Sequence, residues 1–569
     1  MQFKAISSFL IISIALVNPF QSLGQNANIP PAQKMLMHHE TPGDAYLPNA
    51  YKNKKTSPPY RYINNGAPKT AISSIIFTNQ VNVDATGQNI LGDAGNETSI
   101  AVNPLNPNIM AIGWRQFDNV FSNFRQAGWG YTINGGQTWT FPGVLEPGTF
   151  RSDPVLDFDS AGNFYYNSLT NTPDYFCKVF QSTNGGAAWD AGTDAAGGDK
   201  QWMAIDRTAG VGSGNIYSTW TPAFSTCIPD FFTRSTDGNN SYEPCTYVEG
   251  EPFWSTMAVN NAGELYIGGG SSFVADSLIV VKSVNAQVPG SLISWNSVMV
   301  FMDGFLSAQL SVNPAGLLGQ VNIDVDQSGG AGNGNVYLLA SLSRISNSDP
   351  GDVMFAKSTD GGLTWSPPLR INDDISPTNT QWFGTMSVAP NGRIDAVWLD
   401  NREDLSGVDS SALYHSYSID QGNSWSANDK LSALFDPHVG YPMQNKMGDY
   451  FDMVSHNSGA HLAWANTLNG EQDVYYSYII PQTGTEVNEF AGISAFSIFP
   501  NPTNGVFAIS GTANQSLIEI YTVPGVKVYS KSISKTKNRI DISNQPAGIY
   551  FVKIVMNDGS VMIKKIIKN

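Results

Sequence analysis

Short apolar strands joined by polar turns recur through the middle of the chain. Thr256–Tyr266 and Met386–Trp398 each join two β-rich runs through Asn, Asp or Gly, which is the pattern of a β-hairpin. The same form recurs at Ser99–Trp114, Val155–Tyr166, Val321–Leu338 and Met453–Trp464. The pattern predicts antiparallel β structure throughout this region.

A turn motif of the form Ser/Thr-x-Asp/Asn-x-Gly-x-x-Trp lies between these hairpins. The copies are Thr132–Trp139, Ser182–Trp189, a weaker Ser235–Tyr242, Ser358–Trp365 and Ser418–Trp425, and Ser283–Asn285 with Trp295 is a degenerate copy. The Asp or Asn oxygen accepts backbone N–H groups across a turn, and Gly takes a positive φ. The Trp anchors the next strand. We therefore expect structural roles for Asn134, Trp139, Asn184, Trp189, Asp237, Asp360, Trp365, Asp420 and Trp425.

The copies start 48 to 75 residues apart, a period that is typical of solenoids, propellers and arrays. Two strands per hairpin and two around each turn make a four-stranded unit, the form of a propeller blade. Seven units begin near Glu97, Arg151, Lys200, Glu251, Gln320, Thr380 and Gly448, and Ile72–Val83 is expected to complete the last. The fold class expected is all-β, a β-propeller of about seven blades followed by a small C-terminal β-sandwich. Six or eight blades remain open, and unequal steps disfavour a β-helix.

The N-terminus has the features of an export signal. Lys4 precedes the apolar run Phe9–Val17, and Ser22 and Gly24 offer small residues for cleavage, which predicts a signal peptide over residues 1–24. The alternative, a membrane anchor, is disfavoured because the run is short, and no other stretch is long enough for a transmembrane helix. Residues 25–70, rich in Pro, Asn and Lys, are expected to be a leader.

Charge divides the chain into two regions. The whole chain has 31 Lys+Arg and 47 Asp+Glu, a net charge of −16, with only 14% charged residues. From Ala491 onward there are nine basic residues and three acidic ones, so the remainder carries −22. The acidic balance argues against a nucleic-acid partner, and the opposite signs indicate two domains.

Cysteine and histidine usage gives little sign of metal or thiol chemistry. Cys177, Cys227 and Cys245 allow one internal disulfide, and spacing does not choose the pair. The chain has no CxxC or HExxH motif, so we expect no bound metal and no cofactor. The oxygen-rich segment Asp324–Gly330 allows a structural calcium site, but it lacks the EF-hand spacing.

The turn motif resembles the Asp-box (BNR) repeat of sialidase-like β-propellers, over roughly Glu97 to Pro481. In that family the repeat lies on the outer hairpin of each blade, away from the active-site face. The resemblance therefore implies the fold. It does not imply one function, because Asp-box propellers include sialidases, other glycoside hydrolases, receptors and assembly factors.

Sialidases bind the substrate carboxylate with three arginines and use a Tyr nucleophile paired with a Glu, plus an Asp acid/base. Their first arginine lies in a Phe/Tyr-Arg-Ile-Pro motif. The most similar segment of this chain is Phe150–Pro154, in which Ser-Asp replaces Ile. The resemblance gives as candidate catalytic residues Arg115, Arg151, Asp153, Arg402 and Tyr441, with Tyr450 as another possible nucleophile.

Acidic residues also fall at the starts of predicted inner strands. Glu97, Asp153, Glu251 and Asp449 share this position, which in a propeller converges on one face around the axis. Such a ring could bind a cation or sugar hydroxyls, and Trp382 could stack on a sugar ring. The alternative is that each acid caps its own strand, and that the tryptophans belong to the core between blades.

The C-terminal module, expected over residues 494–569 after a linker at 486–493, has short alternating strands. Its ordered motifs are Pro500–Gly505, Gly548–Val552 and the Lys-rich end Lys564–Lys568. They resemble the C-terminal sorting domain of the type IX (Por) secretion system of Bacteroidota. The resemblance implies passage through the outer membrane and a location at the cell surface or outside the cell. A carbohydrate-binding or Ig-like sandwich is the alternative.

Three functions remain open for the propeller, expected over residues 71–485. The first is a cell-surface propeller that engages glycans or glycoproteins, with catalysis unproven. The second is an exo-α-sialidase or other glycoside hydrolase that releases terminal acidic sugars, and the third is a non-catalytic adhesion or protein-interaction propeller. A polysaccharide lyase is less favoured. Three arginines around one carboxylate site would support the enzyme, whereas a plugged axis would support binding alone.

Overall fold

The computed structural model describes residues 46, 55–64, 74–482, 497–510, 516–522, 526–533, 537–555 and 561–569. The predicted signal peptide and the predicted linker at 486–493 lie outside these residues. The chain divides into two compact units, Met1–Pro481 and Gln482–Asn569. Each unit is described by itself.

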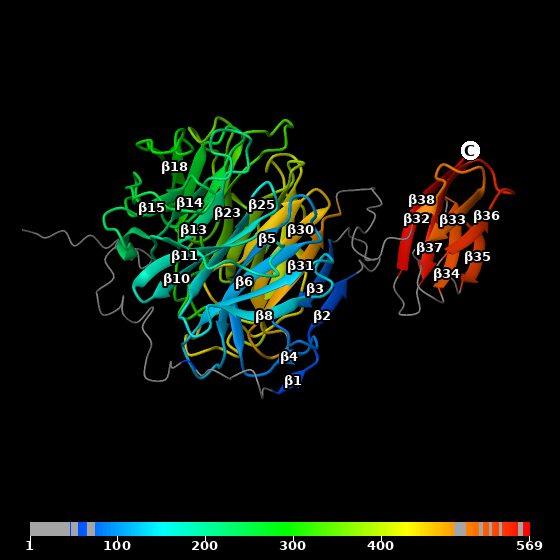
Figure 1. Cartoon of the computed structure of the whole chain (residues 1–569), viewed down its shortest axis with the longest axis horizontal. Helices are drawn as coiled ribbons and strands as arrows, with labels where there is room; N and C mark the ends of the chain where they lie inside the picture. The colour runs from blue at the N-terminus through cyan, green and yellow to red at the C-terminus, as the bar shows by residue number, and fades with distance from the viewer. Residues whose placement is uncertain are drawn as a thin grey trace, which may run out of the picture. The chain divides into compact units, whose positions relative to one another are not determined.

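The first unit is built from antiparallel sheets that follow one another along the chain (Figure 1). The first sheet has β5 (Ala94–Val102), β6 (Met110–Phe117), β7 (Gln126–Thr132) and β8 (Thr140–Leu145). The second has β9 (Ser152–Phe158), β10 (Phe164–Asn171), β11 (Asp174–Ser182) and β12 (Thr193–Ala195). The third has β13 (Trp202–Ile205), β14 (Ile216–Thr219) and β15 (Phe232–Ser235). The fourth has β16 (Phe253–Val259), β17 (Leu265–Gly270), β18 (Ser277–Ser283) and β19 (Asn296–Phe301).

Three further sheets complete this series. The fifth has β20 (Gly304–Phe305), β21 (Asn322–Val325), β22 (Val336–Arg344), β23 (Asp352–Ser358) and β24 (Leu369–Arg370). The sixth has β25 (Gln381–Val388), β26 (Ile394–Asp400), β27 (Ala412–Ser418) and β28 (Asp429–Lys430). The seventh has β29 (Asp452–His456), β30 (Gly459–Asn466) and β31 (Asp473–Ile480), extended by β3 (Ile75–Gln80) and β2 (Arg61–Asn64).

The last of these sheets joins the two ends of the unit, because β3 pairs antiparallel with β31. The sequence pattern predicted this partnership. β2 pairs with β3, and β1 (Thr56–Ser57) pairs with β4 (Asn89–Ile90). Thr56–Ser57 and Arg61–Asn64, expected to be part of a leader, therefore form strands.

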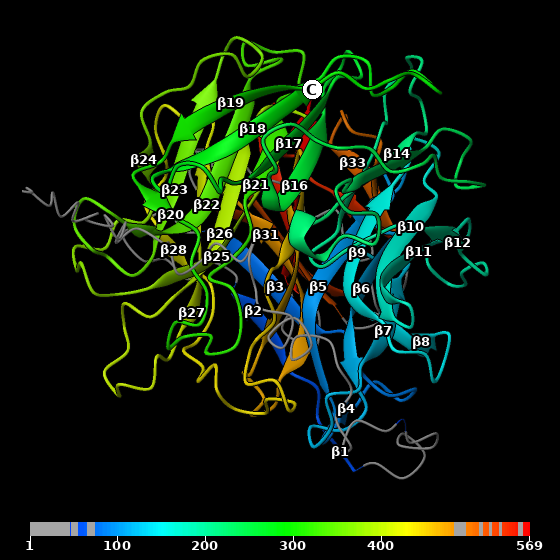
Figure 2. The same cartoon turned by 90° about the vertical axis from the view of Figure 1, so that its left-hand side faces the viewer.

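We call β5, β9, β13, β16, β21, β25 and β29 the inner strands. Each inner strand contacts the inner strand of the next sheet, and β29 contacts β5, so the contacts return to their start. Figure 2 shows inner strands such as β5, β16 and β25 nearer the middle of the unit than β8, β12, β19 and β24. The ends of the inner strands therefore meet in one central region.

Side-chain oxygens join neighbouring inner strands. Asp452 Oδ2 accepts the N–H of Ile100 at 3.0 Å and so links the last sheet to the first. Equivalent bonds run from Leu156 N to Ser99 Oγ, Ile205 N to Asp157 Oδ2, Ile323 N to Thr256 Oγ1, Val388 N to Asp324 Oδ2 and Ser455 N to Ser387 Oγ, at 2.7–3.0 Å. These bonds fix the register between adjacent sheets and satisfy backbone N–H groups that the pairing within a sheet leaves free.

The turn motifs contain the hydrogen bonds expected of turns with a structural role. In Ser358–Trp365, Ser358 Oγ donates to Asp360 Oδ1 at 2.7 Å, and Asp360 Oδ1 accepts the N–H of Thr364 at 2.9 Å. The other turns repeat the bond from Ser or Thr hydroxyl to the Asn or Asp oxygen, at Asn134, Asn184, Asp237 and Asp420. The Trp rings pack inward: Trp139 lies 5.3 Å from Tyr476, Trp189 lies 5.7 Å from Tyr166 and Trp425 lies 5.1 Å from Phe355, while Trp365 packs on the core between the fourth and fifth sheets.

The second unit has two sheets that share one core. One contains β32 (Ser497–Phe499), β33 (Val506–Ser510) and β36 (Lys537–Asp541). The other contains β35 (Lys527–Ile533), β34 (Ser516–Thr522), β37 (Gly548–Val555) and β38 (Val561–Lys568). Buried Phe507, Ile518, Ile540 and Val552 from both sheets pack together.

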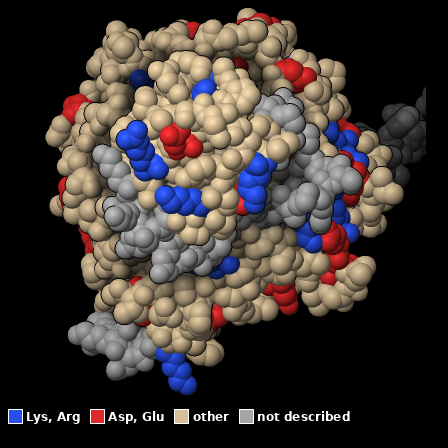
Figure 3. Space-filling view, turned by 90° about the vertical axis from the view of Figure 1, so that its right-hand side faces the viewer, with Lys and Arg blue, Asp and Glu red and all other residues tan. Residues whose placement is uncertain are grey.

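The all-β prediction is confirmed. Within the described residues, no helix is long and apolar enough to cross a membrane. Charged side chains are sparse on the face shown in Figure 3, as the 14% charged content of the chain implies.

Candidate functional site

One residue at the start of each inner strand has a positive φ. These residues are Glu97, Asp153, Lys200, Trp254, Gly319, Phe383 and Gly448, with φ between 47° and 148°. The bulge at Glu97 appears as a register shift between Asn96 and Ser99. A Cβ on Gly448 would lie 2.7 Å from Glu97 Cγ and 2.9 Å from its backbone nitrogen, so only glycine fits there. The bulges aim side chains toward the central region.

Seven charged side chains form a buried ion network there, which we call the central cluster: Glu97, Arg115, Asp153, Asp199, Lys200, Lys446 and Asp449. Each is less than a tenth exposed. Lys446 Nζ lies 2.6 Å from Asp449 Oδ2 and 3.3 Å from Glu97 Oε1. Lys200 Nζ lies 2.8 Å from Asp449 Oδ2 and 3.0 Å from Asp199 Oδ1.

The electrostatics of the central cluster favour ion pairs over a reactive group. Burial raises the pKa of Glu97 to about 7, although Arg115 and Lys446 oppose the shift. Burial also disfavours ionised Asp449, but Lys200 and Lys446 outweigh it and hold the pKa of that carboxyl well below its usual range. The carboxylates around Lys200 outweigh its burial and raise its pKa well above the ordinary value. Lys200 therefore stays charged and paired.

A segment between β20 and β21 covers part of this region. Asp449 Oδ1 accepts the N–H of Leu317 at 2.9 Å, and Asn313 Nδ2 donates to the carbonyl of Gly448 at 2.9 Å. Asn313 Oδ1 accepts the N–H of Met447, and Val312 and Leu318 belong to the hydrophobic core. The segment from Val312 to Leu318 is thus anchored against the start of the seventh sheet.

The structure brings together three of the four acids that the sequence placed on one face. Glu97, Asp153 and Asp449 belong to the central cluster. Glu251 makes no hydrogen bond or ion pair with it, and accepts instead from the Tyr247 hydroxyl at 3.2 Å.

The three candidate arginines occupy separate ion pairs. Arg115 Nε lies 3.1 Å from Glu97 Oε2. Arg151 Nη2 lies 2.5 Å from Glu146 Oε2, and Arg402 contacts Asp373 and Asp400 at 2.6 and 2.8 Å. They belong to the first, second and sixth sheets and share no carboxylate partner.

Of the three aromatic candidates, Trp382 is buried in the core, Tyr450 is buried with its hydroxyl donating to the carbonyl of Pro154 at 2.8 Å, and Tyr441 is half-buried against the core. The Tyr441 hydroxyl has no hydrogen-bond partner, and burial raises the pKa of this phenol. Its ring packs on His438 rather than beside a glutamate. Trp382 is 0% exposed and donates its Nε1 hydrogen to Ser411 Oγ at 3.1 Å, so its ring is not presented for stacking on a sugar.

Two cavities lie in different parts of the described residues of this unit. The first lies between inner strands among Trp202, Gln320, Phe383 and Tyr450, and leaves no space for a water molecule. The second is a surface pocket of about 490 Å³. We call it the β22–β24 pocket; it is lined by Arg344, Asn347, Met354, Pro368, Arg370, Ile375, Ser376 and Pro377.

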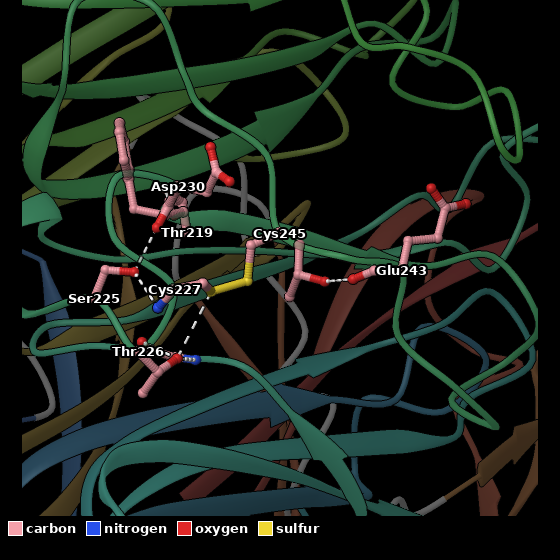
Figure 4. The surroundings of a disulfide bond; sticks show 10 residues. Thr219, Ser225, Thr226, Cys227, Asp230, Glu243 and Cys245 are labelled. Carbon is pink, nitrogen blue, oxygen red and sulfur yellow. Dashed lines mark hydrogen bonds between the residues drawn. A yellow bond between two sulfur atoms is a disulfide. The ribbon is translucent and has the colours of Figure 1, made fainter.

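The structure shows how the cysteines pair and what Asp324 of the oxygen-rich segment contacts. Cys227 pairs with Cys245, and Cys227 N donates to Ser225 Oγ at 3.1 Å (Figure 4). Cys177 is a buried thiol whose pKa is raised to about 12 by burial. Asp324 of the oxygen-rich segment bonds the N–H of Val388 and so joins two sheets.

Sequence reasoning missed Lys200 and Lys446 as partners of the acids. The available signal was charge balance: a strand start that buries a carboxylate requires a cation nearby. Asp199 was missed for the same reason.

Residues 497–569 match the family described as the secretion system C-terminal sorting domain. The second unit is a type IX sorting domain. The protein is therefore secreted by the type IX system to the cell surface or the extracellular space.

Among solved structures, the chain is similar to three proteins at low identity. A GH74 xyloglucanase from Xanthomonas campestris is 15% identical with a TM-score of 0.36, over 90% of this chain and 74% of that one. An α-L-arabinanase from Penicillium chrysogenum is 11% identical with a TM-score of 0.30, over 73% and 92%. A protein of unknown function from Dyadobacter fermentans is 12% identical with a TM-score of 0.37, over 69% and 98%. A search of curated proteins gives no match.

Proposed function

We propose that the first unit of this secreted protein is a seven-bladed β-propeller that binds glycans at the cell surface without turning them over. Seven consecutive sheets whose inner strands contact one another in cyclic order support the propeller. The resemblance of the turns to Asp-box repeats supports the same fold. The cell surface, where a secreted protein of this kind is expected, is where a glycan-binding protein would meet its ligand.

The proposed absence of turnover rests on one observation, the pairing and burial of the charged groups in the central cluster. Its acids and cations form ion pairs with one another, and each of these residues is less than a tenth exposed. A glycosidase needs a carboxylic acid and a base or nucleophile that reach the glycosidic bond. No substrate reaches buried, ion-paired groups of this kind.

The arginine arrangement also disfavours a sialidase. A carboxylate clamp needs three guanidinium groups around one anion, whereas Arg115, Arg151 and Arg402 each have acidic partners of their own. Breaking a buried pair to bind substrate would leave a charge without its partner, which costs about 3–5 kcal/mol.

The β22–β24 pocket is the candidate glycan site. Its volume of about 490 Å³ falls in the range of small-molecule sites, roughly 300–1,000 Å³. Apolar walls from Met354 and Pro377 face polar groups from Asn347 and Ser376, which suits the apolar faces and hydroxyls of a sugar ring.

Charge in this pocket favours a neutral sugar. Arg344 contacts Asp303 and Asp352 at 2.5 and 2.7 Å, and Arg370 contacts Asp352 at 3.3 Å. The two arginines are thus balanced by two carboxylates, which leaves no excess positive charge for a sialic acid.

Two assays on the purified full chain test the proposal. Hydrolysis of a fluorogenic sialic-acid glycoside is expected to show no turnover, and a glycan array is expected to show binding to neutral glycans. Ile375 is 98% exposed at the pocket rim, so Ile375→Ala should weaken binding at least several-fold with unchanged stability. Leu405→Ala, at a side chain 100% exposed and outside the pocket lining, is the matched control.

Turnover that Arg115→Ala, Arg151→Ala or Arg402→Ala abolishes would replace this proposal with a sialidase. Binding that survives Ile375→Ala unchanged would remove the β22–β24 pocket as the site.

A further inference from the structure

The outermost strand of the fourth sheet differs from the outermost strands of the other sheets in the described part of the first unit. β12, β24 and β28 have two or three residues, β15 is wholly buried, β2 contains Arg61, and the six-residue β8 contains Pro142. Short strands, charges and proline keep the edge of a sheet from pairing with another strand. β19 has six residues with no proline and no charge, and it lies at the outside of the unit (Figure 2).

Three residues of β19 direct their backbone groups away from the sheet. β19 pairs antiparallel with β18, and just beyond this ladder the N–H of Met302 donates to the carbonyl of Asp276 at 2.9 Å. Because antiparallel hydrogen bonds alternate along a strand, the N–H and C=O groups of Ser297, Met299 and Phe301 point outward. None of the described strands pairs with β19 on that side.

The side chains of these three residues share one face, which carries an apolar patch. Met299 is 38% exposed and Phe301 is 52% exposed. Ser271 Oγ lies 3.8 Å from Met299 Sδ and accepts the N–H of Phe273 at 3.1 Å, which places the exposed Phe273 in the loop beside the patch. Ile279, opposite Met299 on β18, packs with the third sheet. That sheet has three strands and leaves the outer part of this face uncovered.

We propose that β19 pairs antiparallel with β19 of a second copy of this chain, about a two-fold axis that passes between the two Met299 residues. In this register each Ser297 lies opposite Phe301 of the other copy, and each outward N–H meets an outward C=O. A shift of one residue would set outward groups against groups that already bond to β18. A shift of two residues would leave outward groups unpaired at the ends. A single register therefore satisfies the whole edge.

Charge and side-chain size also favour a second copy. Residues before Ala491 carry a net charge of −22, so two copies repel one another over most of their surface, whereas β19 carries no charge. Glu249, which accepts from Ser297 Oγ at 3.5 Å, would lie at opposite ends of the paired strands in the two copies. The small Ser297 leaves room for the Phe301 ring of the other copy. Closed two-fold dimers are also the commonest oligomers of soluble proteins.

Sedimentation velocity of the full chain over a range of concentrations tests the proposal. The contact is small, so the wild type should dimerise at roughly micromolar concentrations, and added salt should strengthen the dimer by screening the repulsion between acidic copies. Met299→Lys and Met299→Glu should each weaken the dimer by about tenfold or more, because like charges would meet at the axis. An equal mixture of the two variants should dimerise again, because opposite charges then meet there. Met443→Lys, at an exposed methionine outside β19, is the matched control and should dimerise like the wild type.

The urea midpoints of the variants, measured on the monomers, should equal that of the wild type, because Met299 lies at the surface. If a charged variant fails to fold, Met299→Pro replaces it, since proline removes an outward N–H and leaves the bonds to β18 in place. A wild type that stays monomeric up to its solubility limit would overturn the proposal and leave the edge to a strand of another protein. A dimer that both charged variants leave intact would also overturn it. So would a dimer that both weaken and their mixture does not restore, because Met299 would then not face its counterpart.

Discussion

Asp452 gives the sharpest test of how the ring of sheets is closed. Its carboxylate accepts the N–H of Ile100 at 3.0 Å and the hydroxyl of Ser99 at 2.5 Å, and so joins the seventh sheet to the first. Among the residues that the structure describes, no Lys, Arg or His lies within ion-pair distance of it. Burial raises the pKa of Asp452 to about 7 from an ordinary value of 3.8.

The sign of the resulting pH dependence follows from this shift. The folded state holds the proton more tightly than the unfolded chain, so the contribution of Asp452 to stability is complete below pH 3.8. It is lost as the pH rises toward 7. At about 1.4 kcal/mol per pKa unit, the loss is about 4 kcal/mol.

Asp452→Asn isolates this contribution, because the amide oxygen keeps both hydrogen bonds and never ionises. The free energy of unfolding of the variant minus that of the wild type should therefore increase by about 4 kcal/mol between pH 4 and pH 8, because only the wild type loses stability. The other buried carboxyls, such as Asp324 with its pKa raised to about 6, titrate in both proteins and cancel in this difference.

Urea unfolding followed by tryptophan fluorescence makes the measurement, since all 13 tryptophans lie between Trp114 and Trp464 in the first unit. Asp174→Asn, at an exposed residue of the second sheet, is the control and should show a flat difference. A difference for Asp452→Asn that stays within about 1 kcal/mol across this pH range would refute the reasoning.

Two further predictions concern packing and the disulfide. Gly422 has φ +72°, and a Cβ there would lie 2.5 Å from the Phe355 ring, whereas Gly407 has φ +73° and no atom within 4 Å. Gly422→Ala should therefore reduce the free energy of unfolding by about 1–3 kcal/mol more than Gly407→Ala, and equal losses in urea would contradict a packing role. The Cys227–Cys245 disulfide, with a sequence separation of 18, should stabilise the unit by about 3 kcal/mol. Cys245→Ser should lower the urea midpoint, and a midpoint equal to that of the wild type under oxidising conditions would count against it.

The regular part of the fold could be predicted from the sequence because it repeats. Each full turn copy carries its own hydrogen-bonding side chain and its own Trp, so spacing alone located units such as those around Asp360 and Asp420. The position of β3 was predictable because the last unit lacked a strand. In contrast, Ser99 and Thr256, which join sheets, look like ordinary polar residues in apolar strands, and only the packing between sheets gives them a role.

The candidate site was predicted in outline only. Placement at strand starts was enough to bring Glu97, Asp153 and Asp449 together, because equivalent strand ends meet in one region. The pattern did not reveal Lys200 as a partner, since a lysine at the start of a strand resembles an exposed one. Nor did it reveal the covering segment around Asn313, because its contacts with Gly448 connect residues far apart in the sequence.

The charge balance of the central cluster supports the proposal that this region, which the sequence presents as a candidate active site, has a structural role. Four carboxylates face three cations, so full ionisation would leave one excess negative charge in a dry environment. Burial raises the pKa of Glu97 to about 7, with smaller contributions from the neighbouring Asp449 and Asp153, and protonating this one acid would make the cluster neutral. A catalytic acid with such a pKa would need a substrate beside it, whereas Glu97 has Arg115 and Lys446. Neutrality and burial together make the cluster a joint between the first, second, third and seventh sheets, which supports the proposal that a glycan binds elsewhere on the protein.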